Sequence, residues 1–165
     1  MTEIKLFKDR YNNDVYLSFS ENPFSSEPKH VFVICCYRGK WLLTDHIVRG
    51  FEFPGGKVEC CETPTEAAVR EVCEETGGCV SSLTYIGQYK VERKGEPIVK
   101  NIYFAVVDSL EERGHYYETN GPFLMPELPK DIKKDERFSF IMKDDVLTHS
   151  LKQIAQIKQK EPPCN

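Results

Sequence analysis

Residues 55–78 read GGKVECCETPTEAAVREVCEETGG and contain the clearest helix signal in this chain of 165 residues. The run TPTE at residues 63–66 has the form of a capping box with proline at the first helical position, which predicts that a helix begins at residue 64. The pair of glycines at residues 77–78 is typical of a helix end, because glycine adopts the left-handed conformation without a steric cost. The stretch therefore predicts a helix over residues 64–76.

The predicted helix has two chemically different sides, since successive residues are rotated by about 100°. The side expected to pack on the core carries Val69, Val72 and Thr76, flanked by Ala68 and Cys73. The opposite side is expected to carry Glu71, Glu74 and Glu75. The question is which positive group these three acids face.

The three glutamates are spaced i, i+3 and i+4, so their carboxylates repel one another by roughly 0.2–0.5 kcal/mol per pair on an exposed helix. Arg70 can form i, i+4 pairs with Glu66 and Glu74 but cannot neutralise all the charge. A hard divalent cation such as Mg²⁺ or Mn²⁺ meets the remaining need, because it prefers oxygen ligands and keeps positions for water and phosphate. A solvated acidic face is the alternative that the spacing alone leaves open.

Short β-prone segments lie on both sides of this helix. They fall within residues 4–20, where a turn at 12–14 separates two runs, and at 31–37, 40–45, 83–92 and 99–107. Residues 108–131 are rich in proline and glycine and are expected to be a loop, whereas apolar residues at helical spacing predict a closing helix over 143–160. This order of elements predicts an α/β fold with a mixed β-sheet sandwiched between α-helices.

Length, composition and charge restrict the class of protein. A chain of 165 residues with 40% hydrophobic and 29% charged residues is expected to form a single globular domain spanning residues 1–165. The net charge of -4 gives no global reason to bind nucleic acid, so any such contact must be local. Because we find neither a signal peptide nor an apolar run of about 20 residues, we expect a soluble, cytoplasmic protein.

The seven cysteines are an odd number, and none of them form a CxxC motif. They include two adjacent pairs, Cys35-Cys36 and Cys60-Cys61. This usage predicts reduced, mostly buried thiols rather than a disulfide framework or a zinc site. The four histidines have no metal-like spacing and suggest no role.

From Gly56 onward the pattern G-x5-E-x7-R-E-V-x-E-E-x-G closely resembles the Nudix box. The matching residues are Gly56, Glu62, Arg70, Glu71, Val72, Glu74, Glu75 and Gly77. The preceding FEFPGGK, residues 51–57, resembles the segment before the box in MutT-like members. Two positions depart from the usual pattern: Gly78 replaces an aliphatic residue, and Cys61 stands where many members carry glycine.

Four further segments, at residues 23–44, 87–105, 118–129 and 138–147, resemble the YtkD-type subfamily of bacilli. The resemblance implies a nucleoside triphosphatase, acting also on oxidised guanine nucleotides such as 8-oxo-dGTP. It implies as an alternative an RNA pyrophosphohydrolase that trims triphosphorylated 5′ ends, and the box cannot separate the two. A non-catalytic nucleotide-binding sensor is the alternative of another class, which the intact box and the lack of an appended DNA-binding module disfavour.

The resemblance implies roles for individual residues in a hydrolysis that uses Mg²⁺ or Mn²⁺. The expected metal ligands are Glu71, Glu74, Glu75 and the carbonyl of Gly55. The expected catalytic residues are Glu71, Glu74, which is a ligand or a proton acceptor, Arg70, which orients the carboxylates, and Glu118, a general base for which Glu96, Glu111 and Glu112 compete. Gly56, Glu62 and Gly77 are expected to be structural.

Substrate contacts are expected from residues next to the box. Lys57 is expected to reach a phosphate, with pairing to nearby glutamates as the alternative. Phe51 and Phe53 are candidates for stacking on a base, although strand aromatics commonly belong to the core. The cations of the 90–100 hairpin are candidates for an RNA backbone contact, with a solvated turn as the alternative.

Overall fold

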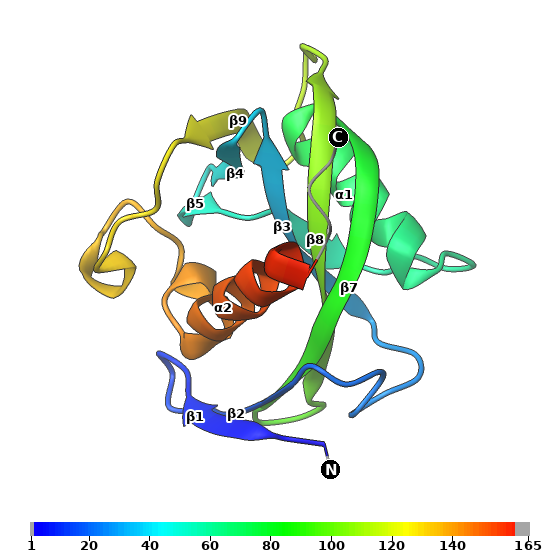
Figure 1. The fold of residues 1–165 in the computed structure, drawn as a ribbon, viewed down its shortest axis with the longest axis vertical. Helices are drawn as coiled ribbons and strands as arrows, with labels where there is room; N and C mark the ends of the chain where they lie inside the picture. Colours follow the sequence, from blue (N-terminus) through cyan, green and yellow to red (C-terminus); the bar gives the residue numbers. More distant parts are fainter. Residues whose placement is uncertain (1, 161–165) are drawn as a thin grey trace.

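The computed structural model describes residues 2–160, and within that range it contains one nine-stranded β-sheet and two α-helices (Figure 1). The strands are β1 (Lys5–Lys8), β2 (Asp14–Ser18), β3 (His30–Tyr37), β4 (Lys40–His46), β5 (Gly50–Glu52), β6 (Gly55–Lys57), β7 (Gly78–Glu92), β8 (Ile98–Leu110) and β9 (Thr119–Met125). The helices are α1 (Pro64–Thr76) and α2 (Asp145–Lys160), with 3-10 turns at Ile132–Lys134 and Phe140–Met142.

The sheet is mixed, as the sequence predicted. Its strands follow the order β1-β2-β7-β8-β3-β4-β5, with β6 paired to β3 and β9 paired to β4. β3 and β8 run parallel, and the other pairs are antiparallel. The parallel register places His30 opposite Lys100. These two residues therefore lie side by side at the end of the sheet where β6 also joins.

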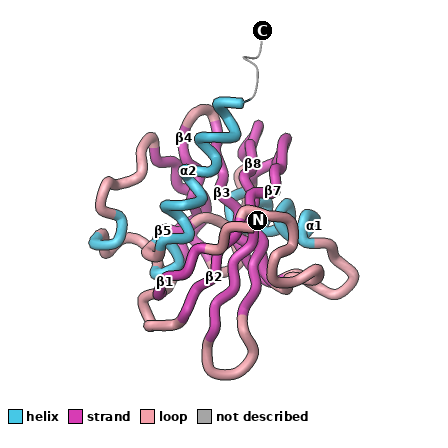
Figure 2. The backbone as a smooth tube through the Cα atoms, turned by 60° about the horizontal axis from the view of Figure 1, so that its bottom comes forward, coloured by secondary structure: helices cyan, strands magenta, loops and turns pink. Residues whose placement is uncertain are grey.

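The two helices cover opposite faces of the sheet (Figures 1 and 2). Alternate residues of β3 point to opposite faces, which explains why this strand is apolar almost throughout. Phe32 and Ile34 join the core that contains Leu147 of α2. Val31 and Val33 join the core beneath α1. The predicted sandwich of a mixed sheet between helices is confirmed.

The start and end of α1 follow the sequence prediction. The Thr63 hydroxyl accepts a hydrogen bond from the backbone N–H of Glu66 at 3.2 Å, and the Glu66 carboxylate accepts one from the backbone N–H of Thr63 at 2.8 Å. Gly77 ends the helix with φ of 73°. A side chain there would place Cβ 2.0 Å from the carbonyl oxygen of Glu111, so both the conformation and the space require glycine.

The predicted core side of α1 is confirmed for Ala68, Val72 and Thr76 but is wrong for Val69, and the three glutamates do not all lie on the opposite side. The buried residues of α1 are Ala67, Ala68, Val72 and Thr76, whereas Val69 is 42% exposed. With about 100° per residue, Glu71 and Glu75 fall inside the arc that these buried residues span. The two alanines let the helix lie close to the sheet, so the longer glutamates point inward beside the core rather than toward solvent.

The segment expected to be a loop contains an additional strand. β8 extends to Leu110, and β9 occupies residues 119–125, where it pairs with β4 from Trp41 to His46. Gly121 and Pro122 are tolerated because β9 pairs only with β4 and lies at an edge. Its strand conformation depends on a partner distant in sequence.

The cysteines of the described residues are free, but the expectation that they are mostly buried is wrong. Cys60, Cys61 and Cys79 are exposed, since the first two lie in the loop between β6 and α1 and the third faces outward on β7. Cys164 and the tail expected to fray, residues 161–165, lie outside the described part of the chain. Neither of the two described helices combines the length and apolar character needed to cross a bilayer.

Candidate active site

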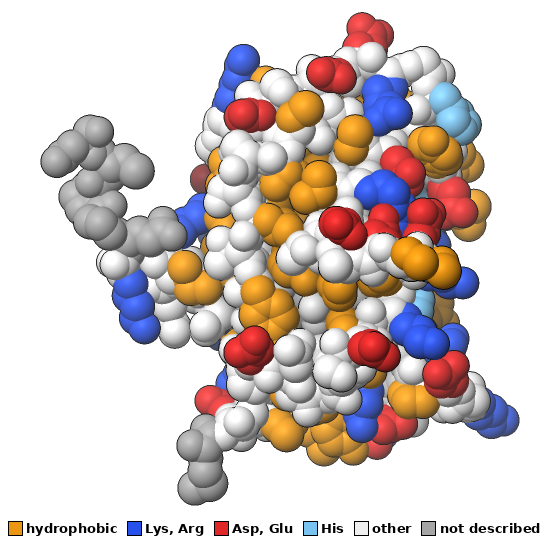
Figure 3. All heavy atoms as spheres, turned by 90° about the vertical axis from the view of Figure 1, so that its right-hand side faces the viewer, with side chains coloured by type: hydrophobic (Ala, Val, Ile, Leu, Met, Phe, Trp, Pro, Cys, Tyr) orange, Lys and Arg blue, Asp and Glu red, His pale blue; other side chains and the backbone are white. Residues whose placement is uncertain are grey.

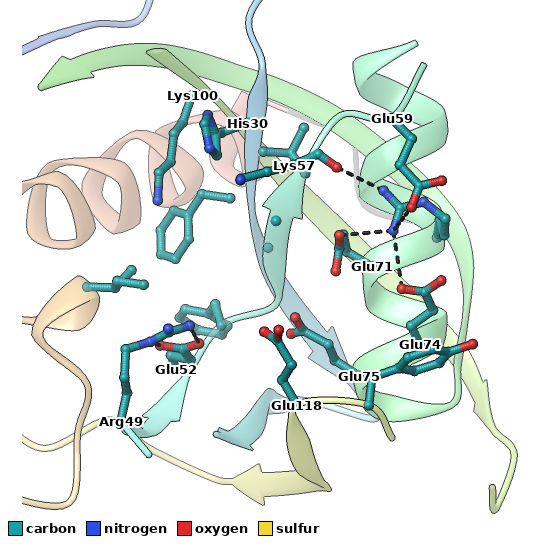
Figure 4. Close-up of a pocket in the computed structure, with 18 of the residues that line it drawn as sticks. His30, Arg49, Glu52, Lys57, Glu59, Glu71, Glu74, Glu75, Lys100 and Glu118 are labelled. Carbon is teal, nitrogen blue, oxygen red and sulfur yellow. Dashed lines mark hydrogen bonds and ion pairs between the residues drawn. The ribbon is translucent and has the colours of Figure 1, made fainter. Parts of the chain in front are cut away.

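A cleft of about 570 Å³ lies between α1 and the segment that joins β5 to β6 (Figure 4). Its acidic end is formed by Glu52, Glu71, Glu74, Glu75 and Glu118. Its basic end is formed by His30, Lys57 and Lys100. In the close-up (Figure 4), His30, Lys57 and Lys100 lie at the upper left and the α1 glutamates lie at the right, whereas Glu52 lies with Arg49 at the lower left.

Gly56 gives the acidic end its shape. A Cβ atom at this position would lie 2.2 Å from Oε1 of Glu71. Such a distance is impossible without displacing the carboxylate, so only glycine lets Glu71 approach the backbone of β6. A larger residue at position 56 would therefore move the Glu71 carboxylate away from the backbone of β6.

Arg70 holds the loop before α1 to the acidic face. Its Nε and Nη2 donate to the two carboxylate oxygens of Glu62 at 2.7 and 2.9 Å, and Nη2 also donates to the carbonyl oxygen of Lys57 at 2.9 Å. Its Nη1 donates to Glu71 at 2.9 Å and to Glu74 at 3.2 Å. The hydrogen bonds to Glu62 and then to Glu71 raise the pKa of Arg70, and the Arg70 guanidinium lowers the pKa of Glu62.

Of the α1 glutamates Glu71, Glu74 and Glu75, Glu75 is the one that Arg70 does not contact. Its Oε2 is buried and has no hydrogen-bond partner among the described residues. Burial, and then the charges of Glu71 and Glu52, raise the pKa of Glu75 to about 9. Burial also raises the pKa of Glu71, although Arg70 opposes this shift. The cations of the acidic end therefore do not suffice to keep Glu75 ionised at neutral pH.

An oxygen-rich, negatively charged set of this kind fits a hard divalent cation better than a soft one. No three His, Cys, Asp or Glu side chains of residues 2–160 already surround a common point as a closed site. Magnesium does not need one, since it is commonly bound by one or two carboxylates with water and substrate phosphates filling the other positions. Glu71 and Glu75 are the residues whose unbalanced charge a cation would relieve most directly.

Two threonines, one on β4 and one on β9, hold the backbone carbonyl of Glu75 in place. The hydroxyls of Thr44 and Thr119 each donate to the Glu75 carbonyl oxygen at 3.2 Å. This carbonyl belongs to the last turn of α1, where helical partners are lacking. The segment that carries Glu118 is therefore tied to the same turn that carries Glu75.

Glu118 lies at the mouth of the cleft with its side chain 84% exposed. Nδ1 of His46 accepts hydrogen bonds from the backbone N–H groups of Val48 and Arg49, both at 3.1 Å. The proton of a neutral His46 therefore resides on Nε2, which lies 3.9 Å from the Glu118 carboxylate. Tyr117, with φ of 60°, turns the backbone so that Glu118 faces the acidic end.

The expected substrate residues have different positions. Lys57 lines the cleft. Phe53 lines it as well but is only 2% exposed, because its ring packs against Phe32 and Trp41. Phe51 does not line the cleft, because its ring stacks on Phe123 with 4.3 Å between centroids. These positions lend no support to the stacking roles expected of Phe51 and Phe53.

Glu52 and His30 line the cleft but were not identified from the sequence, whereas Lys100 was expected only as one of the hairpin cations. Glu52 is 4% exposed and pairs with Arg49 through hydrogen bonds of 3.1 and 2.7 Å. A charged residue between two phenylalanines just before the box was a usable signal for Glu52. His30 and Lys100 meet only through the parallel pairing of β3 and β8, and no local pattern indicates that contact.

Comparison with known proteins places this geometry in a family. A model of the NUDIX domain matches residues 27–146. The chain is similar to YtkD of Bacillus subtilis (strain 168), a candidate 8-oxo-dGTP diphosphatase, with 59% identity over 150 residues that cover 91% of this chain and 95% of YtkD. A shorter stretch of 32 residues, 19% of this chain and 25% of its relative, is 56% identical to the 8-oxo-dGTP diphosphatase of Escherichia coli (strain K12).

The fold is similar to that of solved structures. The pyrophosphohydrolase BsRppH of Bacillus subtilis, solved as its E68A mutant, superimposes with a TM-score of 0.93 and 56% identity, covering 95% of this chain and 99% of that chain. A NUDIX hydrolase from Nitrosomonas europaea superimposes with a TM-score of 0.63 and 18% identity, covering 80% of this chain and 91% of the other. The second likeness concerns the fold alone.

Proposed function

This chain belongs to the Nudix hydrolases, enzymes that act on phosphate anhydrides, and we propose that it hydrolyses the phosphate chain of nucleoside triphosphates with Mg²⁺ or Mn²⁺. The observation that carries this proposal is the half-buried carboxyl group of Glu75, which lies beside Glu71 and whose Oε2 atom is buried and has no hydrogen-bond partner among the described residues. Burial, and then the charge of Glu71, raise the pKa of Glu75, so ionising Glu75 is costly unless a cation is bound. We further propose that the protein acts as a single domain in the cytoplasm, where nucleotide substrates occur.

The proposed ligands of the cation are Glu71 and Glu75, with Glu74 and the Gly55 carbonyl as further oxygen donors. When bound, a divalent cation shields phosphate charge, lowers the pKa of a coordinated water and orients the attack. Arg70 contributes by fixing the rotamers of Glu71 and Glu74 through its two Nη1 contacts. Because Glu62 and the Lys57 carbonyl hold Arg70 from the other side, the carboxylates are positioned before substrate arrives.

The basic end of the cleft is suited to the rest of the substrate. Lys57 and Lys100 both contribute to lowering the pKa of His30 to about 4, after burial, which is the largest cause. Their positive potential therefore extends along the cleft away from the acids. Phe140 and Ile141 add apolar surface at this end, which suits the flat face of a base.

A direct test compares the turnover of dGTP, 8-oxo-dGTP and a triphosphorylated oligoribonucleotide at equal concentration. We expect divalent-cation-dependent hydrolysis of the free nucleotides, with kcat/KM highest for the oxidised one. No hydrolysis of any of the three would contradict the proposal and favour a non-catalytic nucleotide-binding sensor.

The RNA 5′ end remains a second candidate substrate because the chain is similar to the pyrophosphohydrolase BsRppH over nearly its whole length. Of the hairpin cations, Lys100 lines the cleft, Arg93 and Lys94 are exposed, and Lys90 pairs with Glu92 at 2.7 Å. Preference for the oligonucleotide over both free nucleotides would assign the RNA function. Indifference to the oligonucleotide would reject it.

Glu118 is the proposed general base, and its replacement by glutamine separates proton transfer from metal binding. General bases typically contribute about 10²–10⁴-fold. We expect Glu118→Gln to lower kcat by roughly 100-fold while Mn²⁺ affinity, measured by electron paramagnetic resonance, stays within about twofold. Glu112→Gln is the matched control, since Glu112 is exposed and does not line the cleft. Equal activity of the two variants would remove Glu118 from this role.

A further inference from the structure

Two adjacent thiols lie together outside the cleft. Cys60 and Cys61 are both exposed, and their Sγ atoms are 3.6 Å apart. They belong to the loop between β6 and α1, which projects at the right of Figure 1. Figure 3 shows the molecule from that side, where acidic side chains gather beside exposed hydrophobic ones. The proposed hydrolysis uses neither thiol.

The turn geometry brings these thiols together. The backbone N–H of Glu62 donates to the carbonyl oxygen of Glu59 at 3.2 Å, so the two cysteines occupy the central positions of a β-turn. Cys61 has φ of 64°, the left-handed conformation that the second central residue of a type II turn requires. Glycine takes this conformation freely, whereas another residue pays about 1–3 kcal/mol. A thiol is therefore held at a position where a side chain is costly.

Adjacency in sequence does not by itself produce such a pair. Cys35 and Cys36 are also neighbours, but they lie in β3, where successive side chains point to opposite faces. Cys35 is buried in the core beneath α1, and Cys36 packs against the core beneath α2. Cys35 and Cys36 therefore cannot bind a common ligand, whereas the Cys60 and Cys61 thiols are close enough to do so.

The turn is rigidly anchored at both ends. The backbone N–H of Glu59 donates to the Glu62 carboxylate at 3.1 Å, and the same carboxylate receives two hydrogen bonds from Arg70. The preceding Lys57 carbonyl is bound to Arg70 as well. Because the thiols need not be brought together by a ligand, little conformational entropy is lost on binding.

We propose that Cys60 and Cys61 form a two-thiol binding site for a soft, thiophilic ion of the trivalent arsenic or Cd²⁺ class. Two sulfurs that share one ion at metal–sulfur distances of about 2.3 Å stand roughly 3.4 Å apart in the pyramidal geometry of trivalent arsenic and about 3.8 Å apart in a tetrahedral geometry. The observed separation lies between these two values and is well beyond a disulfide bond of about 2.0 Å. No third side chain completes a zinc-type site within residues 2–160, which favours ligands that need only two thiols.

The reaction with a monosubstituted arsenical balances without an oxidant. Phenylarsine oxide carries arsenic bound to one oxygen, and two S–H groups convert it to two As–S bonds and one water molecule. Arsenic stays trivalent and both sulfurs stay at the thiol level. A single thiol can form only one As–S bond, so an adduct that survives excess monothiol reports a pair.

The test is intact-mass spectrometry of the full chain with phenylarsine oxide, followed by excess 2-mercaptoethanol or a vicinal dithiol. We expect one adduct on the wild type that resists the monothiol, is removed by the dithiol, and maps to the peptide with Cys60 and Cys61. Cys60→Ser and Cys61→Gly should lose it, and the glycine variant also relieves the strained turn, so it should fold. Cys79→Ser, which removes a single exposed thiol, should keep it.

A second arm titrates Cd²⁺ in excess Mg²⁺ and follows the thiolate-to-cadmium absorbance band, to which carboxylate sites do not contribute. The wild type and Cys79→Ser should show the band, and Cys60→Ser should lose most of it. The proposal is overturned if the wild type forms no monothiol-resistant adduct, if Cys60→Ser retains it, or if the cadmium band is unchanged in Cys60→Ser. These readouts do not depend on hydrolysis, so they stand apart from the proposed function.

Discussion

Glu75→Gln is expected to lower divalent-cation-dependent hydrolysis by about 10³-fold or more while the protein stays folded. Glutamine keeps the size of the side chain but removes the charge that the proposed cation needs. A bound metal ion commonly stabilises the charge of a transition state by several kcal/mol, and this stabilisation is lost with the cation. Turnover of dGTP at saturating Mg²⁺, compared with the wild type and with Glu112→Gln, measures the effect.

The same variant is expected to be more stable than the wild type when the metal is removed. The pKa of Glu75 is raised by burial and by Glu71 and Glu52, so folding favours its protonated form. A carboxyl with a raised pKa stabilises the fold fully below its unfolded pKa of about 4.5, and this contribution is lost as the pH rises toward 9. At pH 7.5 in EDTA, Glu75→Gln should therefore raise Tm by roughly 5 °C.

Saturating Mn²⁺ should reverse that order, because it stabilises the wild type and has little to bind in the variant. Thermal melts at pH 5 and pH 7.5, each with EDTA and with Mn²⁺, give the Tm values needed for both the wild type and the variant. In EDTA the wild type should lose its disadvantage at pH 5, where Glu75 is protonated. A variant that hydrolyses dGTP at the wild-type rate, or that is stabilised by Mn²⁺ as strongly as the wild type, would contradict the ligand assignment.

Arg70→Met is expected to lower hydrolysis by roughly 100-fold and the free energy of unfolding by about 2–4 kcal/mol. The Arg70 side chain is 21% exposed, and its guanidinium forms ion pairs with four carboxylates, which lose their shared cation in the variant: Glu59, Glu62, Glu71 and Glu74. Methionine keeps the apolar stem, which isolates the loss of charge. Denaturant unfolding and Mg²⁺-dependent turnover measure the two effects.

Arg70→Lys should recover little of either loss, since an ammonium cannot donate to Glu62 through two nitrogens and reach Glu71 as well. Arg10→Met is the control, because Arg10 is exposed and remote from the cleft. Near-normal activity of Arg70→Met together with a large loss of stability would show that Arg70 supports the loop only. The proposed orienting role would then be wrong.

Local signals in the sequence were sufficient for α1 and for the hairpins. The capping box at Thr63 and Glu66 and the glycine at residue 77 fix the helix ends through contacts between near neighbours. Arg38 and Gly39 both have positive φ, 49° and 76°, as the tight hairpin between β3 and β4 requires. Such contacts involve few residues, so a short window of sequence contains them.

The orientation of α1 depended on distant contacts. Val69 is apolar but exposed, whereas the alanines at 67 and 68 are buried because the helix lies close to the sheet. Periodicity gives most weight to large apolar residues, so the predicted core side included Val69 and missed Ala67, although Ala68, Val72 and Thr76 are buried as expected. The consequence matters for function, since Glu75 is half-buried beside Glu71 rather than solvated, and this position raises the pKa of Glu75.

The cleft likewise combines predictable and unpredictable parts. Glu71, Glu74 and Glu75 come from one helix and were found together. Lys100 and His30 come from β8 and β3, which pair in parallel. Thr119 comes from β9, which pairs with β4, a strand far away in the sequence. Pairings between distant segments are set by the whole fold, and no local pattern of residues indicates them.

The central claim is that Glu71 and Glu75 hold a divalent cation against a polyphosphate. Crystals of the wild type soaked with Mn²⁺ and a nonhydrolysable nucleoside triphosphate, measured for anomalous scattering, test it most directly. The account predicts an anomalous peak about 2.0–2.3 Å from carboxylate oxygens of both residues, with phosphate oxygens completing its coordination. Ordered triphosphate in the cleft with no anomalous peak beside either glutamate would contradict it.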